Sequence, residues 1–359
     1  MELHVVQAEF GDCLLLKYGT NASPRFILID GGPPETYQRH LKATLQKVAA
    51  SGAKLDLAML SHVDNDHVIG LLDYFADLRA GAGGLPRPPV LWHNSFEDTI
   101  DPTGTLVPRL AAIMALSNSS VMSETGLAVN GIGEGRSLRI HALALGMDLN
   151  KGFAGGLITL DSAGGTRQFD NITLQVVGPT QANLQALRDK WAEWLDDNEG
   201  NLQNDDPFVM ANSDQSVPNL SSIMVLAKGG GRTMLLTGDG RSDHLLEGLD
   251  AAGLLDGQGK MHVDVLKLPH HGSSRNITRT FFKKVTADVY VASANGKDDN
   301  PDLATLIWLV EAAKEQNRHP KIVVTNRTPS VQKLLEEYPK ADLGYTLEVM
   351  PSNDSVMIV

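Results

Sequence analysis

The sequence contains a single cysteine, Cys13, so the chain cannot form an internal disulfide. Cys13 stands beside the apolar residues "LLL", which favours a buried core residue over a nucleophile. No apolar run approaches the ~20 residues that a membrane-spanning helix needs, so no membrane partner is expected. The first residues, "MELHVVQAEFGD", lack a basic stretch followed by an apolar one, and a cytoplasmic location is predicted.

Positive charge is also scarce, because 31 Lys and Arg residues stand against 43 Asp and Glu residues, for a net charge of −12. Such a balance repels polyanions at long range and excludes a broad basic face for nucleic acid. Nucleic acid could therefore bind only in a local basic groove. The stretch "SSRNITRTFFKK" offers Arg275 and Arg279, one turn apart if the segment is helical, as candidate phosphate contacts. The alternative is a solvated helix face.

Apolar and charged residues make up 42% and 21% of the chain, as in soluble globular proteins. Short β-forming runs such as "RFILIDGG", "LDLAMLSH" and "TMLLTGD" alternate with helix-period segments such as "DLATLIWLVEAAKEQN". The first three runs follow one another with short turns, so part of the sheet is expected to be antiparallel. These patterns predict stacked layers of strands and helices.

Two stretches interrupt this alternation. Residues 98–166 and 195–219 are rich in Gly, Ser, Asn and Asp, and we predict loop-rich insertions there. Such insertions serve as lids or substrate-binding loops, and a solvated surface loop is equally compatible with them. No linker separates two autonomous parts, so residues 1–359 are predicted to form one domain. Trp191 and Trp194 are interpreted as the apolar edge of a helix rather than a base-stacking surface.

The stretch "LAMLSHVDNDHVIGLL" places four ionisable groups directly after a predicted buried strand. Within six residues it carries His62, Asp64, Asp66 and His67. Bringing these groups together is costly unless a partner neutralises the carboxylates and uses the imidazoles, and a divalent cation does both. The loop would lie at the carboxyl end of the strand, where sheets of this kind place ligands. It therefore predicts a metal site.

Other predicted strands end in residues of the same type. "TMLLTGDG" ends in Asp239, and "VDVLKLPHHGSS" ends in His270 and His271. "RFILIDGG" ends in Asp30, which could bind metal or, preferably, orient a ligand through a hydrogen bond. "PVLWHN" ends in His93, for which a substrate or metal contact and a structural hydrogen-bonded role are both open.

The segments "LIDGG", "SHVDNDH", "LLTGD" and "LPHHGS", in this order, resemble the metallo-β-lactamase fold superfamily. The resemblance is greatest to the metallohydrolase domain of DNA-uptake competence proteins and its free-standing cytoplasmic relatives. These share an early "GD", here Gly11 and Asp12, and a segment like "PNLSSIMVL". The resemblance implies an α+β fold, a four-layer αββα sandwich, with metals bound at one edge between two sheets.

Carried onto this chain, the resemblance implies one or two divalent ions, zinc or manganese, that share the carboxylate of Asp239. The ligands of the first ion would be Asp66, His67, Asp239 and one of His270 and His271. His62 and Asp64 would hold a second ion. Asp12 and Asp30 would orient ligands without binding the metal.

This chain departs from the superfamily pattern at two metal-binding positions. Asp64 replaces the usual histidine, and this oxygen ligand favours harder ions such as Mn²⁺. A histidine often found 20 to 25 residues before the bridging aspartate is replaced by Asn219, whose amide oxygen is a weak candidate ligand.

Such a site supports hydrolysis by a metal-bound hydroxide. Asp66 would orient the nucleophile or accept its proton, and a histidine of the pair that is not a ligand, with His271 the chosen candidate, would protonate the leaving group. A phosphodiesterase or nuclease, acting on nucleic acid or a small phosphodiester, is the first hypothesis. The alternatives are a hydrolase of another small ester, thioester or amide, and a catalytically weak metal-binding subunit of a multi-protein system. No feature indicates a particular protein partner.

Overall fold

The computed structural model describes residues 1–95, 98–99, 124–153, 156–198 and 219–359. Within these ranges the side chains of residues 124–132 and 193–198 and of Ala163, Leu187, Lys190, Trp191 and Asn219 lie outside the described part. Predictions for Trp191, Trp194, the Asn219 side chain and most of 195–219 therefore fall outside it. Among the described helices, none combines the length and the apolar character that crossing a bilayer requires.

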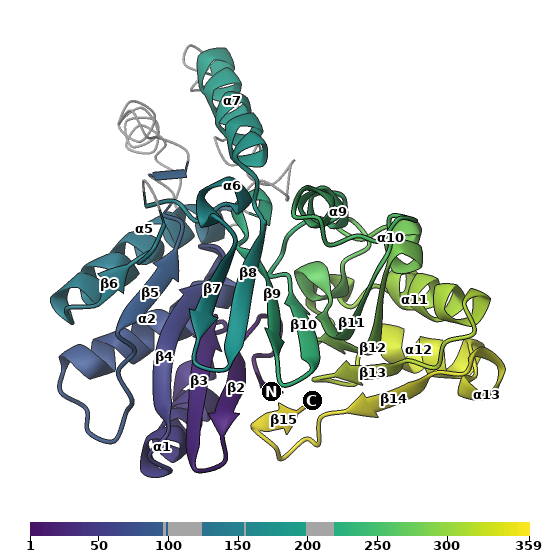
Figure 1. The fold of residues 1–359 in the computed structure, drawn as a ribbon, viewed down its shortest axis with the longest axis horizontal. Coiled ribbons are helices and arrows are strands. Elements are labelled where there is room, and N and C mark those ends of the chain that lie inside the picture. Colours follow the sequence, from purple (N-terminus) through teal and green to yellow (C-terminus); the bar gives the residue numbers. More distant parts are fainter. Residues whose placement is uncertain (96–97, 100–123, 154–155, 199–218) are drawn as a thin grey trace.

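Two mixed sheets form the centre of the molecule (Figure 1). The first sheet has the order β15 (Val356–Ile358), β1 (Glu2–Val6), β2 (Leu14–Thr20), β3 (Ser23–Ile29), β4 (Lys54–Leu60), β5 (Val90–His93) and β6 (Asp148–Leu149). Its strands pair antiparallel from β15 to β3 and parallel from β3 to β6. The expected antiparallel start of the chain is therefore present.

The second sheet has the order β14 (Thr346–Val349), β13 (Lys321–Val324), β12 (Val285–Ala292), β11 (Met261–Lys267), β10 (Arg232–Leu236), β9 (Met224–Gly229), β8 (Ile172–Gly178) and β7 (Thr166–Phe169). Strands β7 to β10 pair antiparallel, and β10 to β14 pair parallel. Each sheet thus combines an antiparallel half with a parallel half.

Helices cover the outer face of each sheet (Figure 1). On the first sheet lie η1 (Tyr37–Leu41), α1 (Lys42–Ala50), α2 (Asn65–Arg79) and α5 (Glu124–Ala144). On the second lie α9 (Ser242–Ala251), α10 (Arg279–Lys284), α11 (Leu303–Glu315), α12 (Pro329–Glu337) and α13 (Lys340–Leu343). The short α6 (Leu160–Ala163) and the longer α7 (Gln181–Asn198) rise at the top of the view. The layers therefore follow the predicted αββα order.

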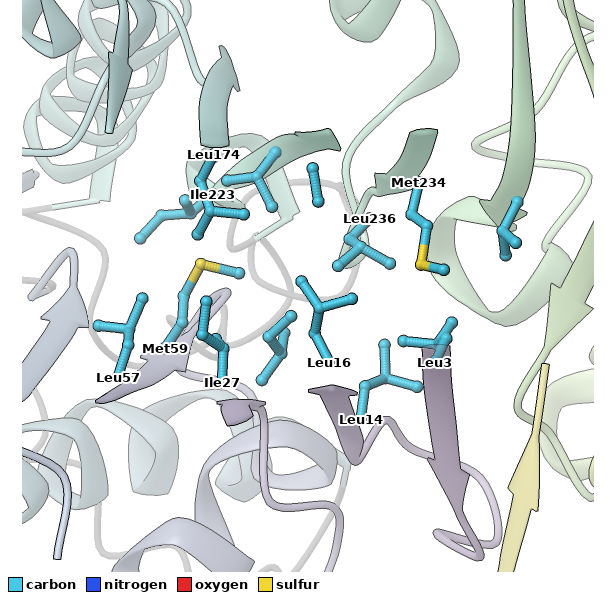
Figure 2. Packing of buried hydrophobic residues seen from close by; sticks show 14 of the residues in the cluster. Leu3, Leu14, Leu16, Ile27, Leu57, Met59, Leu174, Ile223, Met234 and Leu236 are labelled. Carbon is cyan, nitrogen blue, oxygen red and sulfur yellow. The ribbon is translucent and has the colours of Figure 1, made fainter. Parts of the chain in front are cut away.

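Side-chain alternation in the strands explains this layering. Leu14 and Leu16 of β2 pack between the sheets, whereas Leu15 packs against the helices outside. Leu236 of β10 meets the inward leucines from the opposite sheet (Figure 2). A strand buried on both faces reads as a continuous apolar run, which is why "LLL" carries no polar alternation. Each fully buried leucine contributes about 1.5–3 kcal/mol to the stability.

Helix α5 lies within the stretch 98–166, where the sequence predicts loops. That prediction is wrong for residues 124–144, because Leu138 and Ala142 are buried against the outer face of the first sheet. The glycines of "NGIGEG" lower helix propensity, but the burial of the apolar face outweighs this cost. Residues 100–123 of the predicted insertion lie outside the described residues.

The parallel halves of the two sheets bring their strand ends together at one edge. The backbone N–H of Ile223, just before β9, donates to the carbonyl of Ser61, just after β4, at 2.9 Å. The N–H of His270 donates to the carbonyl of Gly238 at 3.1 Å. These bonds join the loops that carry the predicted metal ligands.

The close packing of α2 against the loop after β3 can be tested at Gly70, where the two backbones are in contact. A Cβ on Gly70 would lie 1.9 Å from the carbonyl oxygen of Gly31. Gly70→Ala is therefore expected to lower the free energy of unfolding by about 1–3 kcal/mol, the usual range for overpacking. Urea denaturation measures this. Gly83→Ala, where an added Cβ meets nothing within 4 Å, is the control, and equal losses in the two variants would contradict the close packing.

Candidate metal centre

Four side chains from both sheets converge at the shared edge. Asp66 and His67 come from the first turn of α2, Asp239 from the loop after β10, and His271 from η3 (Pro269–Gly272) after β11. Each offers one ligand atom, and these atoms all lie within 4.8 Å of one another. The structure therefore brings together residues that are separated by up to 205 positions in the sequence (271 − 66).

The donor atoms face one another directly. His67 Nε2 lies 3.3 Å from Asp239 Oδ1. His271 Nε2 lies 3.4 Å from both Asp66 Oδ2 and Asp239 Oδ2. We call Asp66, His67, Asp239 and His271 the tight donor group. Its composition of two imidazoles and two carboxylates suits a divalent transition metal.

Hydrogen bonds on the far side of each ring set the direction of the two histidines. His67 Nδ1 lies 2.8 Å from Asp30 Oδ2, and His271 Nδ1 lies 2.9 Å from the carbonyl of Ser293. Both partners are acceptors, so in the neutral rings each Nδ1 carries the proton and each Nε2 can present its lone pair to the donor group. A carboxylate or carbonyl behind a ligating imidazole is the usual arrangement at protein metal sites.

The buried donors lack other partners among the described residues. His62 Nε2, Asp64 Oδ1, His67 Nε2, Asp239 Oδ1 and His271 Nε2 are buried without a hydrogen-bond partner. Leaving such a polar group unpaired costs about 1–3 kcal/mol. A divalent cation would satisfy several of them at once, so the residues present fit a metal ion.

A second, looser set of donors also faces Asp239. His62 Nε2 is 3.4 Å from Asp64 Oδ2 and 3.8 Å from Asp239 Oδ2. His270 Nε2 is 3.7 Å from the same Asp239 oxygen. Donors of both sets therefore face the Asp239 carboxylate, with His62, His270 and His271 all facing Oδ2.

Asp12 and Asp30 also lie within reach of His67. Asp30 already accepts hydrogen bonds from the backbone N–H and the hydroxyl of Ser61, both at 2.7 Å, besides the one from His67. Asp12 forms a buried ion pair with Lys267. Asp30 and the Oδ2 of Asp12 therefore have partners of their own, whereas Asp12 Oδ1 is buried without one among the described residues. The orienting role of both carboxylates stays a prediction.

Left-handed backbone conformations hold three of these side chains. Asp30, His270 and His271 have φ values of 59°, 45° and 54°. Non-glycine residues rarely adopt this region, and the cost is tolerated where the surrounding structure fixes the residue. The adjacent histidines consequently point in different directions: His271 enters the tight donor group, and His270 lies at its rim with 22% of its side chain exposed.

Charge coupling shapes the acid–base behaviour of the site. Burial disfavours a charged imidazole, but the carboxylates of Asp239, Asp30 and Asp66 outweigh it and hold the pKa of His67 well above its ordinary value. Burial also lowers the pKa of His271, but the carboxylates of Asp239 and Asp12 outweigh it and hold this pKa well above its ordinary value. Burial would raise the pKa of Asp239, yet the neighbouring histidines hold it well below its usual range. Protons and a cation therefore compete for the same donor atoms.

The predicted phosphate contacts are separated by the structure. Arg275 is exposed in the turn that follows His271. Helix α10 begins only at Arg279, so the condition for the one-turn spacing, a helix that includes Arg275, is not met. Arg279 lies 3.1 Å from both Glu311 and Glu315 of α11. Thr278 caps the helix N-terminus, which explains why the helix starts four residues after Arg275.

His93 lies at the end of β5, buried to 4% exposure, with neither ring nitrogen hydrogen-bonded within the described residues. Burial, aided by the charge of Arg139, lowers its pKa to about 4. The ring is therefore neutral at pH 7. An added Cβ on Gly135 of α5 would lie 3.5 Å from His93 Nε2, so α5 passes directly over it.

Sequence reasoning missed two contributors to the site. Lys267 is fully buried at the end of β11, and the hydroxyl of Ser222 accepts a hydrogen bond from the N–H of Asp239 at 3.3 Å. A lysine in the apolar run "VDVLKLP" was the available signal for the first. Ser222 carried no comparable signal, because serine is common beside strands.

Comparison with known proteins gives one family match. The family described as "Metallo-beta-lactamase superfamily" matches residues 11–126. No curated protein matches the chain.

Two solved structures align with nearly the whole chain at low sequence identity. The metallo-beta-lactamase fold protein YhfI from Bacillus subtilis is 10% identical with a TM-score of 0.42, covering 100% of this chain and 98% of its own. A protein of unknown function from Enterococcus faecalis V583 is 11% identical with a TM-score of 0.30, covering 97% of this chain and 87% of its own.

The matched segment contains Asp12, Asp30 and the loop from His62 to His67. The narrower resemblance to competence proteins stays a prediction. The chain therefore matches that superfamily over residues 11–126, and its two helix-covered sheets carry a donor cluster at their shared edge.

Proposed function

We propose that this protein is a metal-dependent phosphodiesterase that cleaves small phosphodiesters or short nucleic acids. Members of the superfamily that residues 11–126 match are in general metal-dependent hydrolases. The observation that carries the narrower proposal is that the Asp239 carboxylate faces donors of both groups. Asp66, His67, Asp239 and His271 would hold one divalent ion and His62 and Asp64 a second, and such ions would supply Lewis acidity and a water of lowered pKa for phosphoryl displacement.

The ligand chemistry supports the same substrate class. Each donor group contains a carboxylate besides Asp239, namely Asp66 in the tight donor group and Asp64 in the looser one. Oxygen-rich sites favour Mn²⁺ over sites built from nitrogen and sulfur alone. The net charge of −12 opposes long polyanions, so we expect short substrates to be preferred over long duplexes.

Asp66 and His270 have positions suited to proton transfer. The side chain of Asp66 is 25% exposed, so its carboxylate can orient an attacking water or accept its proton. His270 Nδ1 donates to Asn276 Oδ1 at 2.8 Å, which leaves Nε2 on the side of Asp239. We assign the second ion to His62 and Asp64 and not to His270, whose Nε2 would donate a proton to the leaving oxygen. We prefer His270 to His271 for this role because His271 Nε2 lies inside the tight donor group.

We propose substrate contacts from the positions of residues near the donor groups. Arg275 is exposed in the turn between His271 and Asn276 and would contact a substrate phosphate. Arg279 is not included, because it lies on α10 and its guanidinium is directed to Glu311 and Glu315 of α11. His93 stays a candidate contact for an uncharged part of the substrate.

The first prediction concerns activity. With Mn²⁺, Asp66→Ala and His67→Ala are each expected to lower kcat/KM on bis(p-nitrophenyl) phosphate by at least about 100-fold, because each removes a ligand or a proton acceptor. Arg279→Ala is the control and is expected to keep the wild-type rate. Short single-stranded DNA and p-nitrophenyl acetate serve as comparison substrates. Metal-loaded wild-type protein that hydrolyses only the carboxylic ester, or nothing at all, would contradict the phosphodiesterase proposal.

The second prediction concerns pH. Since neighbouring carboxylates raise the pKa of His67 and His271, an ion must displace protons, and its apparent affinity is expected to fall as the pH falls. Calorimetric titration with Mn²⁺ in buffers of different ionisation enthalpy should show a release of about one to two protons per ion. His262→Gln, which alters an exposed histidine, should leave this number unchanged. A binding heat independent of the buffer would rule out the displacement.

A further inference from the structure

A lysine is buried directly beside the metal centre. Lys267, the last residue of β11, has no exposed surface, and its ammonium forms an ion pair with Asp12, which is 1% exposed. A buried charge is costly unless it is paired, and an ion pair rarely stabilises a fold more than apolar residues of the same size would. The position of this pair therefore needs an explanation other than stability.

The pair spans the two sheets. Lys267 belongs to the second sheet, and Asp12 lies in the loop between β1 and β2 of the first sheet. The ammonium also lies 3.5 Å from the carbonyl of Gly238, the residue before Asp239. Lys267 therefore also contacts the loop that carries Asp239.

Asp12 connects the same pair to the other ligands. Its N–H donates to the carbonyl of Asp66 at 3.3 Å, and its Oδ1 lies 3.4 Å from His271 Nδ1. The preceding Gly11 packs so closely on Asp66 that an added Cβ would lie 2.0 Å from the Asp66 carbonyl oxygen. The carbonyl of Gly11 accepts the Ser293 hydroxyl at 2.6 Å.

These contacts reach three of the four members of the tight donor group without adding a ligand to it. One path runs from Lys267 through Gly238 to Asp239, and the other through Asp12 to Asp66 and His271. Because Asp66 belongs to the first sheet and the other two to the second, the spacing of the sheets at this edge determines whether the donors fit one ion. Misplacing a ligand by a fraction of an ångström weakens a metal site markedly.

We infer that Lys267, through its ion pair with Asp12, is a positioning residue that fixes the distance between the two sheets at the metal centre and thereby sets the metal affinity of the tight donor group. The inference rests on one part of the proposed function, namely that the protein binds a divalent ion. It stands independently of which bond the enzyme cleaves.

The test measures metal affinity and stability separately. Lys267→Met, Asp12→Asn and the double variant would be purified metal-free and titrated with Mn²⁺ and Zn²⁺ by chelator competition, while urea denaturation measures the stability of each metal-free protein. Removing one partner leaves a buried charge unpaired, so the single variants are expected to be less stable. The double variant carries no unpaired charge and keeps nearly the same volume, which keeps the test informative if a single variant fails to fold.

The double variant is expected to be more stable than the single variants. It should nevertheless bind whichever of Mn²⁺ and Zn²⁺ the wild type binds more tightly with 10- to 100-fold lower affinity, the range found for residues that orient metal ligands. Arg25→Met is the matched control, because Arg25 pairs with Asp56 across β3 and β4 at 2.6 Å, at the end of those strands away from the centre. It should keep wild-type metal affinity. A folded double variant with wild-type affinity for both ions would overturn the inference. No hydrolysis is measured, so an inactive wild-type protein that binds metal leaves the inference standing and refutes only the proposed phosphodiesterase.

Discussion

At the edge where the two sheets meet, buried nitrogen and oxygen donors have no hydrogen-bond partner within the described part of the chain, and this constrains the structure there. Four residues present ligand atoms within 4.8 Å of one another, and the outer nitrogens of His67 and His271 are held by Asp30 and by the Ser293 carbonyl. Turning these donors towards solvent would break the hydrogen bonds behind them. The arrangement makes physical sense when a divalent cation neutralises the carboxylates and uses both imidazoles.

The fold supplies this convergence through its parallel strands. The ends of β3 and β4 in one sheet and of β10 and β11 in the other point to the same edge, so a residue just past any of them enters the centre. The apolar side chains between the sheets (Figure 2) keep the sheets packed along their length. At the edge itself that role falls to polar contacts, among them the pair of Lys267 with Asp12.

Much of this could be predicted from the sequence. Strands buried on both faces appear as short apolar runs, and the loop from His62 to His67 concentrates ionisable groups that only a partner ion can make favourable. Helix α5 could not be predicted, because burial of Leu138 and Ala142 decides its formation against the local glycines. The different directions of His270 and His271 depend on backbone conformation, and the ion pairs of Arg279 depend on a helix distant in sequence.

Element-specific anomalous diffraction tests the central claim most directly. Crystals grown with Mn²⁺ or Zn²⁺, measured on both sides of the absorption edge, should show a strong peak enclosed by Asp66, His67, Asp239 and His271, with a second peak beside His62 and Asp64 when both groups are filled. The absence of any peak at this edge, in crystals where these side chains are ordered and metal is in excess, would contradict the account.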